Sequence, residues 1–175
     1  MKIKIKLFNG QEMPKIIRKG EWIDLAANED VTLGPPRVEG VLNDDGSISQ
    51  NVVFDTKRIR LGVAMRLPDG FEAHVLPRSS TFRKTLTLLS NSQGIIDNSF
   101  CGDNDEWMYE AIALGHCNIK KGDRICQFRI ELSQKATVWQ KLRWLLSGKI
   151  TLEETPCLYG SDRGGFGSTD RKGAV

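Results

Sequence analysis

Short segments in which apolar and polar residues alternate are the strongest constraint on the fold of this 175-residue chain. A period of two places successive side chains on opposite faces of a β-strand. The alternating segments are residues 2–8, 59–66, 71–77 and 124–132. Turn signals separate them, as at Asp44–Gly46, Pro68–Gly70 and Lys121–Asp123. Many short strands at this spacing predict an all-β body, either a closed barrel or a double sheet.

Two segments depart from this pattern. One short amphipathic helix is predicted over residues 137–147, where five apolar residues recur at helical spacing before Gly148: Val138, Trp139, Leu142, Leu145 and Leu146. We expect this apolar face to pack against the β body or a neighbouring subunit; the alternative is a docking surface for a partner protein. Residues 37–52 contain the Asp44–Gly46 turn signal and predict a flexible loop or a hairpin.

The length of the chain predicts one domain. The charge predicts no nucleic-acid surface, because 25 basic residues are balanced by 22 acidic ones and neither sign is clustered. A zinc site is not expected, because two histidines accompany four cysteines that form no C-x-x-C pair. The N-terminus has the pattern of a strand rather than of a signal peptide, and no apolar run reaches membrane-spanning length. We therefore expect a cytoplasmic protein with reduced thiols and no membrane partner.

The glycine-rich stretch Gly160–Asp170 carries one arginine, Arg163, and one aromatic ring, Phe166. Glycines let a backbone approach a ligand closely and present N–H groups to an anion. The guanidinium of Arg163 suits phosphate oxygens, and the ring of Phe166 can stack on a base. A disordered, solvated tail is the alternative for such a composition.

Four internal segments combine turn geometry with polar groups. An acid, Asp24, lies between apolar residues on a predicted strand, and Pro77–Thr81 places an arginine and hydroxyls directly after another strand. Asn91–Asp103 contains Asp97, which could polarise water or could satisfy its own turn. Gly122–Gln127 is a tight turn that enters a strand. The chain has no P-loop, H-E-x-x-H or Ser–His pattern, so any phosphate chemistry must use carboxylate, metal and water.

In this order, the five segments resemble the five motifs of the trimeric dUTP pyrophosphatase (dUTPase) family. They are Asp24–Leu25, Pro77–Ser80, Gly94–Gly102, Gly122–Gln127 and Arg163–Thr169. The local sequence of residues 20–25 and 102–107 is most similar to the branch found in Gram-positive bacteria and their phages.

The resemblance implies a jelly-roll β domain over residues 1–158 and a flexible glycine-rich arm over residues 159–175. It also implies a homotrimer whose arms each close over a neighbouring subunit's site. The implied activity is Mg²⁺-assisted hydrolysis of dUTP to dUMP and pyrophosphate, which limits uracil incorporation into DNA and supplies dUMP for dTMP synthesis.

The resemblance also assigns roles to individual residues. Asp97 would activate the attacking water, Phe100 would pack on the sugar and exclude a 2′-OH, and Asp24 would position Mg²⁺ through water. The uracil would be read by Asn91, Gly94, Ile95 and Ile96. The phosphates would be held by Arg78, Ser79, Ser80 and Gln127. From a third subunit, the substrate contacts would come from Arg163, Phe166, Gly167 and Ser168.

The chain departs from the family's usual pattern at several positions. Phe100 replaces a tyrosine, Asp103 stands where glutamate is common, and Trp22-Ile23 precedes Asp24 in place of other residues. The arm motif is shorter between Arg163 and Phe166. None of these changes removes a group that the chemistry requires.

Two other functions fit parts of the sequence. A dCTP deaminase, alone or as a bifunctional deaminase–dUTPase, has the same fold but needs a glutamate as proton shuttle, for which Glu110 is the candidate. A phage-type regulator that binds a repressor protein is the other, with the helix over 137–147 as its interface. Because all five motifs persist, we interpret regulation as an added role.

Overall fold

The computed structural model describes residues 1–16 and 21–165, so the predicted contacts of Phe166, Gly167 and Ser168 lie outside the described residues. The described chain is mainly β, as predicted. Its elements are β1 (Lys2–Leu7), β2 (Ile23–Ala26), β3 (Val31–Leu33), β4 (Arg37–Leu42), β5 (Ile48–Val53), β6 (Thr56–Arg60), β7 (Val63–Arg66), β8 (Phe71–Pro77), α1 (Thr81–Thr85), β9 (Thr87–Leu89), β10 (Gly94–Asp97), β11 (Met108–Ala113), β12 (Cys117–Ile119), β13 (Arg124–Leu132), α2 (Val138–Leu146) and β14 (Thr151–Glu154).

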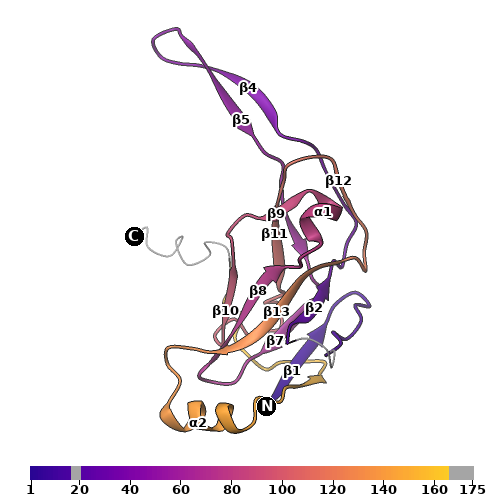
Figure 1. The fold of residues 1–175 in the computed structure, drawn as a ribbon, viewed down its shortest axis with the longest axis vertical. Coiled ribbons are helices and arrows are strands. Elements are labelled where there is room, and N and C mark those ends of the chain that lie inside the picture. Colours follow the sequence, from indigo (N-terminus) through magenta and orange to yellow (C-terminus); the bar gives the residue numbers. More distant parts are fainter. Residues whose placement is uncertain (17–20, 166–175) are drawn as a thin grey trace.

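The strands form several small sheets around one core (Figure 1). A four-stranded sheet has the order β10-β8-β13-β2, and three-stranded sheets have the orders β14-β1-β7 and β6-β11-β9. Two-stranded pairs are formed by β12 with β3 and by β4 with β5. The strand β10 is therefore an edge of the largest sheet, paired with β8 on one side only.

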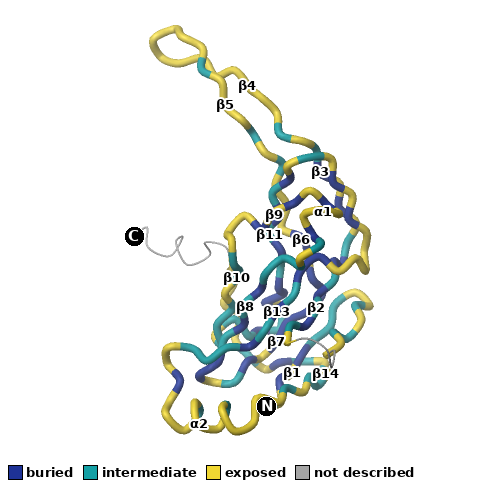
Figure 2. The backbone as a smooth tube through the Cα atoms, viewed as in Figure 1, coloured by how far each residue is buried: buried dark blue, intermediate teal, exposed yellow. Residues whose placement is uncertain are grey.

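The alternation read from the sequence matches the burial of the strands (Figure 2). In β8 the side chains of Phe71, Ala73 and Val75 are buried, while the residues between them are partly exposed. Trp107, Tyr109 and Phe128 are the largest fully buried side chains, and the rings of Trp107 and Phe128 meet edge to face at 5.3 Å. Such a core explains why the body needs no disulfide; its four cysteines are free.

The predicted single strand over residues 59–66 is wrong in one respect, because it is two strands, β6 and β7. The chain turns at Gly62, which has φ of +68°. A Cβ there would lie 2.8 Å from the Gln11 Cβ and from the Asn28 side chain. Only glycine fits both the left-handed backbone and this close approach.

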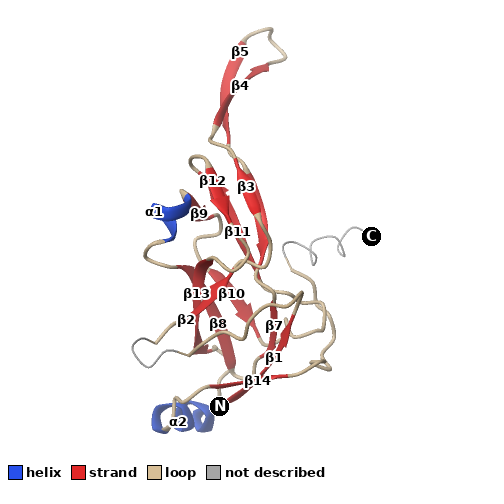
Figure 3. Cartoon of the chain, turned by 90° about the vertical axis from the view of Figure 1, so that its right-hand side faces the viewer, coloured by secondary structure: helices blue, strands red, loops and turns tan. Residues whose placement is uncertain are grey.

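Residues 37–53 form the hairpin β4–β5, which extends away from the body in two views (Figures 1 and 3). Its turn is set by Gly46, with φ of +82°, and by the Asp45 carboxylate, which accepts hydrogen bonds from the Ser47 N–H and hydroxyl. This confirms the hairpin alternative for the segment.

The helix α2 confirms the predicted element, but its orientation differs from the expectation. Its N-terminus has a capping box formed by Thr137 and Gln140. Trp144 contacts Phe71 of the body edge to face at 5.3 Å, and the Gln140 amide donates to the Asp69 carbonyl.

The five apolar residues predicted to face the body are instead exposed: Val138, Trp139, Leu142, Leu145 and Leu146. They lie on the opposite side of α2 from Trp144, so packing of this face on its own β body was wrong. A neighbouring subunit or a partner protein as its cover stays a prediction. No helix among the described residues is long and apolar enough to cross a membrane.

Candidate active site

A pocket of about 330 Å³ opens beside the edge strand β10. This volume is in the range of small-molecule sites. Seven of the predicted site residues line the pocket: Asn91, Gly94, Ile95, Ile96, Asp97, Phe100 and Arg163. The structure therefore brings together the residues predicted to contact the base and sugar, the predicted catalytic acid and the arginine of the arm.

The segment before β10 is held in a tight conformation. Ser92 has φ of +62°, and the Gln93 N–H donates to the Asn91 carbonyl. The Gln93 side chain makes a 2.7 Å hydrogen bond to His74 of β8. Gly94 faces Val75, and a Cβ at Gly94 would lie 3.3 Å from the Val75 Cβ. The wall near the predicted base contacts is thus backbone packed against a strand.

Asp97 is the last residue of β10, and both of its carboxylate oxygens have partners. Oδ1 accepts hydrogen bonds from the Ser99 N–H at 2.8 Å and from the Ser99 hydroxyl at 2.6 Å. Oδ2 accepts one from Arg163 Nη1 at 2.8 Å. Partial burial raises the pKa of Asp97, but the Ser99 hydrogen bonds and the Arg163 charge outweigh it and hold the pKa below its ordinary value. The carboxylate is therefore ionised at neutral pH.

Phe100 lies at the pocket wall and packs partly on the core. Its backbone N–H donates to the Asp97 carbonyl, so one turn fixes both residues. On the arm side, a Cβ at Gly165 would lie 3.4 Å from the Phe100 ring. The arm thus passes close to one edge of this ring.

A second group of predicted residues lies on the same sheet, at its other strands, where β2, β8 and β13 meet. Asp24 of β2 is mostly buried, with 15% of its side chain exposed. Its Oδ1 accepts from Arg78 Nε at 2.7 Å, and its Oδ2 accepts from Arg124 Nη1 at 3.0 Å. We call Asp24, Arg78 and Arg124 the guanidinium cluster.

The neighbours of the guanidinium cluster are the other predicted phosphate ligands. Gln127 is the cross-strand partner of Asp24, and its amide donates to the Pro77 carbonyl at 3.3 Å. Ser79 and Ser80 follow Arg78 and lead into α1. Thr81 anchors this turn, because its buried hydroxyl donates to the Ile125 carbonyl at 2.6 Å and accepts from the Arg78 N–H.

Within the described chain, the predicted site residues therefore form two groups rather than one. The residues of the guanidinium cluster are not among the described residues that line the β10 pocket. The sequence reading also missed several residues of the pocket wall, among them Val75, Leu89, Glu106, Trp107 and Met108. Glu106 is buried and accepts from the Gly62 N–H and from Arg60, so it braces the wall. The only sequence signal for these five wall residues was that they belong to strands or to the segment 102–107.

Comparison with known proteins decides the family. The sequence profile described as dUTPase matches residues 45–141. The SPbeta prophage-derived deoxyuridine 5'-triphosphate nucleotidohydrolase YosS of Bacillus subtilis is 42% identical over 173 residues, which is 98% of this chain and 100% of that protein. The chain belongs to the dUTPase family.

Further relatives agree with this membership. A deoxyuridine 5'-triphosphate nucleotidohydrolase of Rickettsia canadensis is 40% identical over 119 residues, covering 67% of this chain and 70% of that protein. The dUTPase from phage phi11 of S. aureus superposes with a TM-score of 0.59 at 16% identity, covering 78% of this chain and 93% of that one. The similarity to the phage phi11 structure shows the shared fold and confirms the predicted jelly-roll class.

The glutamate that a deaminase would need does not line the pocket of this dUTPase-family chain. Glu110 of β11 makes hydrogen bonds to Arg58 at 3.0 Å and to the Ser90 hydroxyl at 3.1 Å. It is not among the described residues that line the β10 pocket. This geometry argues against the deaminase alternative.

The guanidinium cluster offers a metal ion one carboxylate, that of Asp24, whose two oxygens accept from Arg78 and Arg124. No group of three or more His, Cys, Asp or Glu side chains in residues 1–16 and 21–165 is arranged to hold a metal ion. Mg²⁺ usually keeps several waters and is bound through one or two carboxylates together with substrate phosphates. Asp24 can supply one such carboxylate.

Proposed function

We propose that this chain hydrolyses dUTP to dUMP and pyrophosphate, with Asp97 as the general base. The observation that carries the proposal is the position of Asp97, an ionised carboxylate on the wall of the β10 pocket, beside Phe100 and Arg163. A carboxylate in that state can accept a proton from water. Hydrolysis between phosphates requires mainly an aligned water and neutralised charge.

The β10 pocket suits the nucleoside part of the substrate. Asn91 and the backbone of Gly94, Ile95 and Ile96 would contact the uracil edge, and the packing of Gly94 on Val75 leaves this wall little freedom to move. The ring of Phe100 would lie against the sugar. A 2′-OH pressed against this ring would lack a hydrogen-bond partner, which disfavours ribonucleotides by about 1–3 kcal/mol.

The guanidinium cluster suits the triphosphate. Arg78 and Arg124 present planar donors, and Ser79, Ser80 and Gln127 add neutral ones nearby. Mg²⁺, when bound, would neutralise phosphate charge, and Asp24 would hold its water ligands. One solved dUTPase variant from phage phi11 is described with a structural Mg(II) ion. The chemistry of our cluster is compatible with such a hard cation.

We further propose that the two groups of residues complete one another in a homotrimer, and that the arm over 159–175 closes over a neighbouring subunit's site. Within one chain, residues up to Gly165 lie on their own body and Arg163 pairs with its own Asp97. An exchange of this identical element between subunits would preserve the same contacts.

The activity is tested by incubating the purified protein with dUTP and, separately, with dCTP in the presence of Mg²⁺. We expect pyrophosphate and dUMP from dUTP, and no ammonia from either substrate. Ammonia release from dCTP would instead establish the deaminase. If the protein releases neither pyrophosphate nor ammonia, both assignments are contradicted. Chelation of Mg²⁺ should stop turnover while the circular dichroism spectrum is unchanged.

The exchange of the arm is tested with two variants of strongly reduced activity, Asp97→Asn and Arg163→Ala. When they are co-expressed, an exchanged arm brings an intact Arg163 to an intact Asp97 in some mixed trimers, so we expect activity to reappear. Each variant expressed alone is the control. A mixture as inactive as its components would show that Arg163 serves the Asp97 of its own chain.

A further inference from the structure

The root of the arm lies in close backbone contact with the loop that follows Phe100. A Cβ at Gly102 would lie 2.5 Å from the Asp162 Cα, and a Cβ at Gly160 would lie 2.2 Å from the Cys101 carbonyl oxygen. Contacts this short leave room for glycine only. Two glycines, one on each side, therefore allow the loop over residues 101–105 and the arm root over residues 157–164 to lie against each other.

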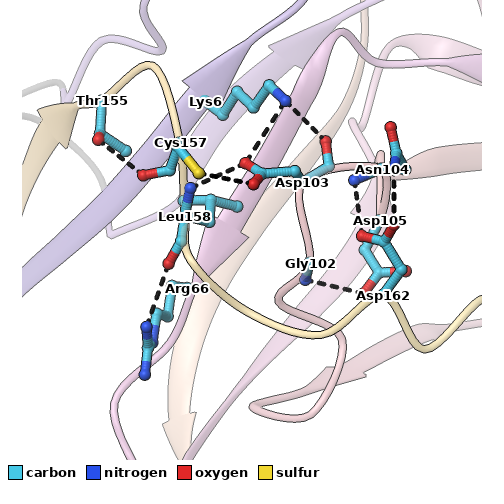
Figure 4. Close-up of polar contacts among 10 residues, drawn as sticks. All are labelled: Lys6, Arg66, Gly102, Asp103, Asn104, Asp105, Thr155, Cys157, Leu158 and Asp162. Carbon is cyan, nitrogen blue, oxygen red and sulfur yellow. Dashed lines mark hydrogen bonds and ion pairs between the residues drawn. The ribbon is translucent and has the colours of Figure 1, made fainter.

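Carboxylates on both sides close this contact (Figure 4). Asp103 accepts hydrogen bonds from the Cys157 thiol at 2.7 Å and from the Leu158 N–H at 2.8 Å. In the opposite direction, Asp162 of the arm accepts from the backbone and the side chain of Asn104 at 2.9 and 2.6 Å. The loop thus binds the arm root at two exposed or partly exposed positions.

The third carboxylate, Asp105, is different because it is buried, with 2% of the residue exposed. It accepts backbone hydrogen bonds from Gly102 at 2.9 Å, from Arg163 at 3.0 Å and from Gly164 at 3.0 Å. A buried carboxylate is stable only when such donors replace its water. The backbone of Arg163 is therefore fixed by Asp105, and its guanidinium reaches Asp97 Oδ2 from this fixed position.

We propose that Asp105 is a positioning residue for dUTP hydrolysis, which holds the backbone of Arg163 and Gly164 so that the Arg163 guanidinium is delivered to the reacting phosphates beside Asp97. The inference rests on the proposed dUTPase activity. It assigns to the loop after Phe100 the task of anchoring the arm, whichever subunit supplies that arm. Asp103 and Asp162 support the same contact from its exposed side.

The test is Asp105→Asn, which keeps the shape but removes the charge and turns an amide NH₂ toward backbone donors. We expect kcat/KM for dUTP to fall by about 10- to 100-fold, because charge-assisted hydrogen bonds to the arm are lost. Inhibition by dUMP should stay within about threefold of wild type, because dUMP lacks the outer phosphates that the guanidinium contacts. Asp45→Asn, which changes a carboxylate that accepts from a backbone N–H in the distant hairpin, is the matched control and should behave as wild type.

A double-mutant cycle shows whether Asp105 acts through Arg163. If it does, Asp105→Asn should reduce kcat/KM by less than about twofold in an Arg163→Ala background. Additive losses, or an equal loss of dUMP and dUTP binding, would overturn the proposal. If Asp105→Asn does not fold, Gly160→Ala displaces the arm root from the other side and should give the same selective loss for dUTP.

The two proposals fail in different ways. A wild-type protein that does not hydrolyse dUTP contradicts the function itself. An active wild-type protein whose Asp105→Asn variant retains full kcat/KM contradicts only the positioning role.

Discussion

The β10 pocket and the guanidinium cluster reach their shapes by different physical means. The pocket is built mainly from backbone, rings and aliphatic side chains, several of which pack on the core, and its polar lining residues are Asn91, Asp97, Glu106 and Arg163. The cluster is built from opposite charges that attract one another, since the one carboxylate of Asp24 binds both Arg78 and Arg124, which leaves a net positive charge.

The difference predicts how each region responds to a ligand. A packed pocket discriminates by shape, because moving its wall would disturb the core. A cluster of paired charges discriminates by charge, because its guanidinium groups can exchange a carboxylate for phosphate oxygens at small net cost. Substitutions in the pocket should therefore change chemistry and selectivity, while those in the cluster should change metal and phosphate dependence.

The largest expected effect is that of Asp97→Asn. The amide can still accept from Ser99, but it presents a donor to Arg163 and cannot take a proton from water. We expect kcat to fall by about 10²- to 10⁴-fold while dUTP binding stays within about tenfold. Single-turnover hydrolysis and equilibrium binding measure the two quantities. More than about a tenth of wild-type turnover would remove Asp97 from its assigned role.

A smaller effect, of another kind, is expected for Asp24→Asn. This change leaves the β10 pocket intact but removes the countercharge of Arg78 and Arg124. We expect the Mg²⁺ concentration for half-maximal activity to rise by about tenfold, with dUMP binding unchanged. Asp55→Asn is the control, because Asp55 likewise pairs with an arginine, Arg37, at the base of the hairpin. An unchanged Mg²⁺ dependence would break the proposed division between the regions.

Next comes Phe100→Ala, which opens the pocket wall against the sugar. We expect the ratio of kcat/KM for dUTP over UTP to fall by about 10-fold, mainly because UTP improves. Phe82→Ala, which changes an exposed ring on α1, provides the comparison. A ratio that does not change would mean that this ring does not contact the sugar.

The smallest expected effect concerns the acid limb of the pH–rate profile, where activity falls as the pH is lowered. Burial raises the pKa of Asp97, but Ser99 and Arg163 together lower it by more. The value of kcat/KM, which reports the free enzyme, should therefore hold as pH falls below neutrality and decline only when the pH passes this depressed pKa. Arg163→Ala removes one of the lowering causes, so its acid limb should move to higher pH. The measurement is kcat/KM for dUTP of the wild type and of Arg163→Ala across the acid range. A limb that moves to lower pH would contradict the Arg163–Asp97 pair.

Much of this molecule was readable in the sequence. Alternation identified β1, β8 and β13 because one face of each strand is buried, and the five motifs gave the residues of both regions. The helical spacing of apolar residues and the following Gly148 predicted a helix over residues 137–147, which is close to the observed α2. These features are local, and local patterns of polarity and backbone preference determine them.

Only the tertiary structure decided how these pieces face one another. Helical spacing gives an apolar face of α2 but cannot tell that Trp144, on the other side, is the residue that meets Phe71. Likewise, Asp105 in the sequence is one of several acids in a polar loop. It becomes the anchor of the arm only because Arg163 and Gly164, which follow it by 58 and 59 positions in the chain, donate their backbone N–H groups to it. Contacts of this kind depend on where the rest of the chain lies, so no local pattern encodes them.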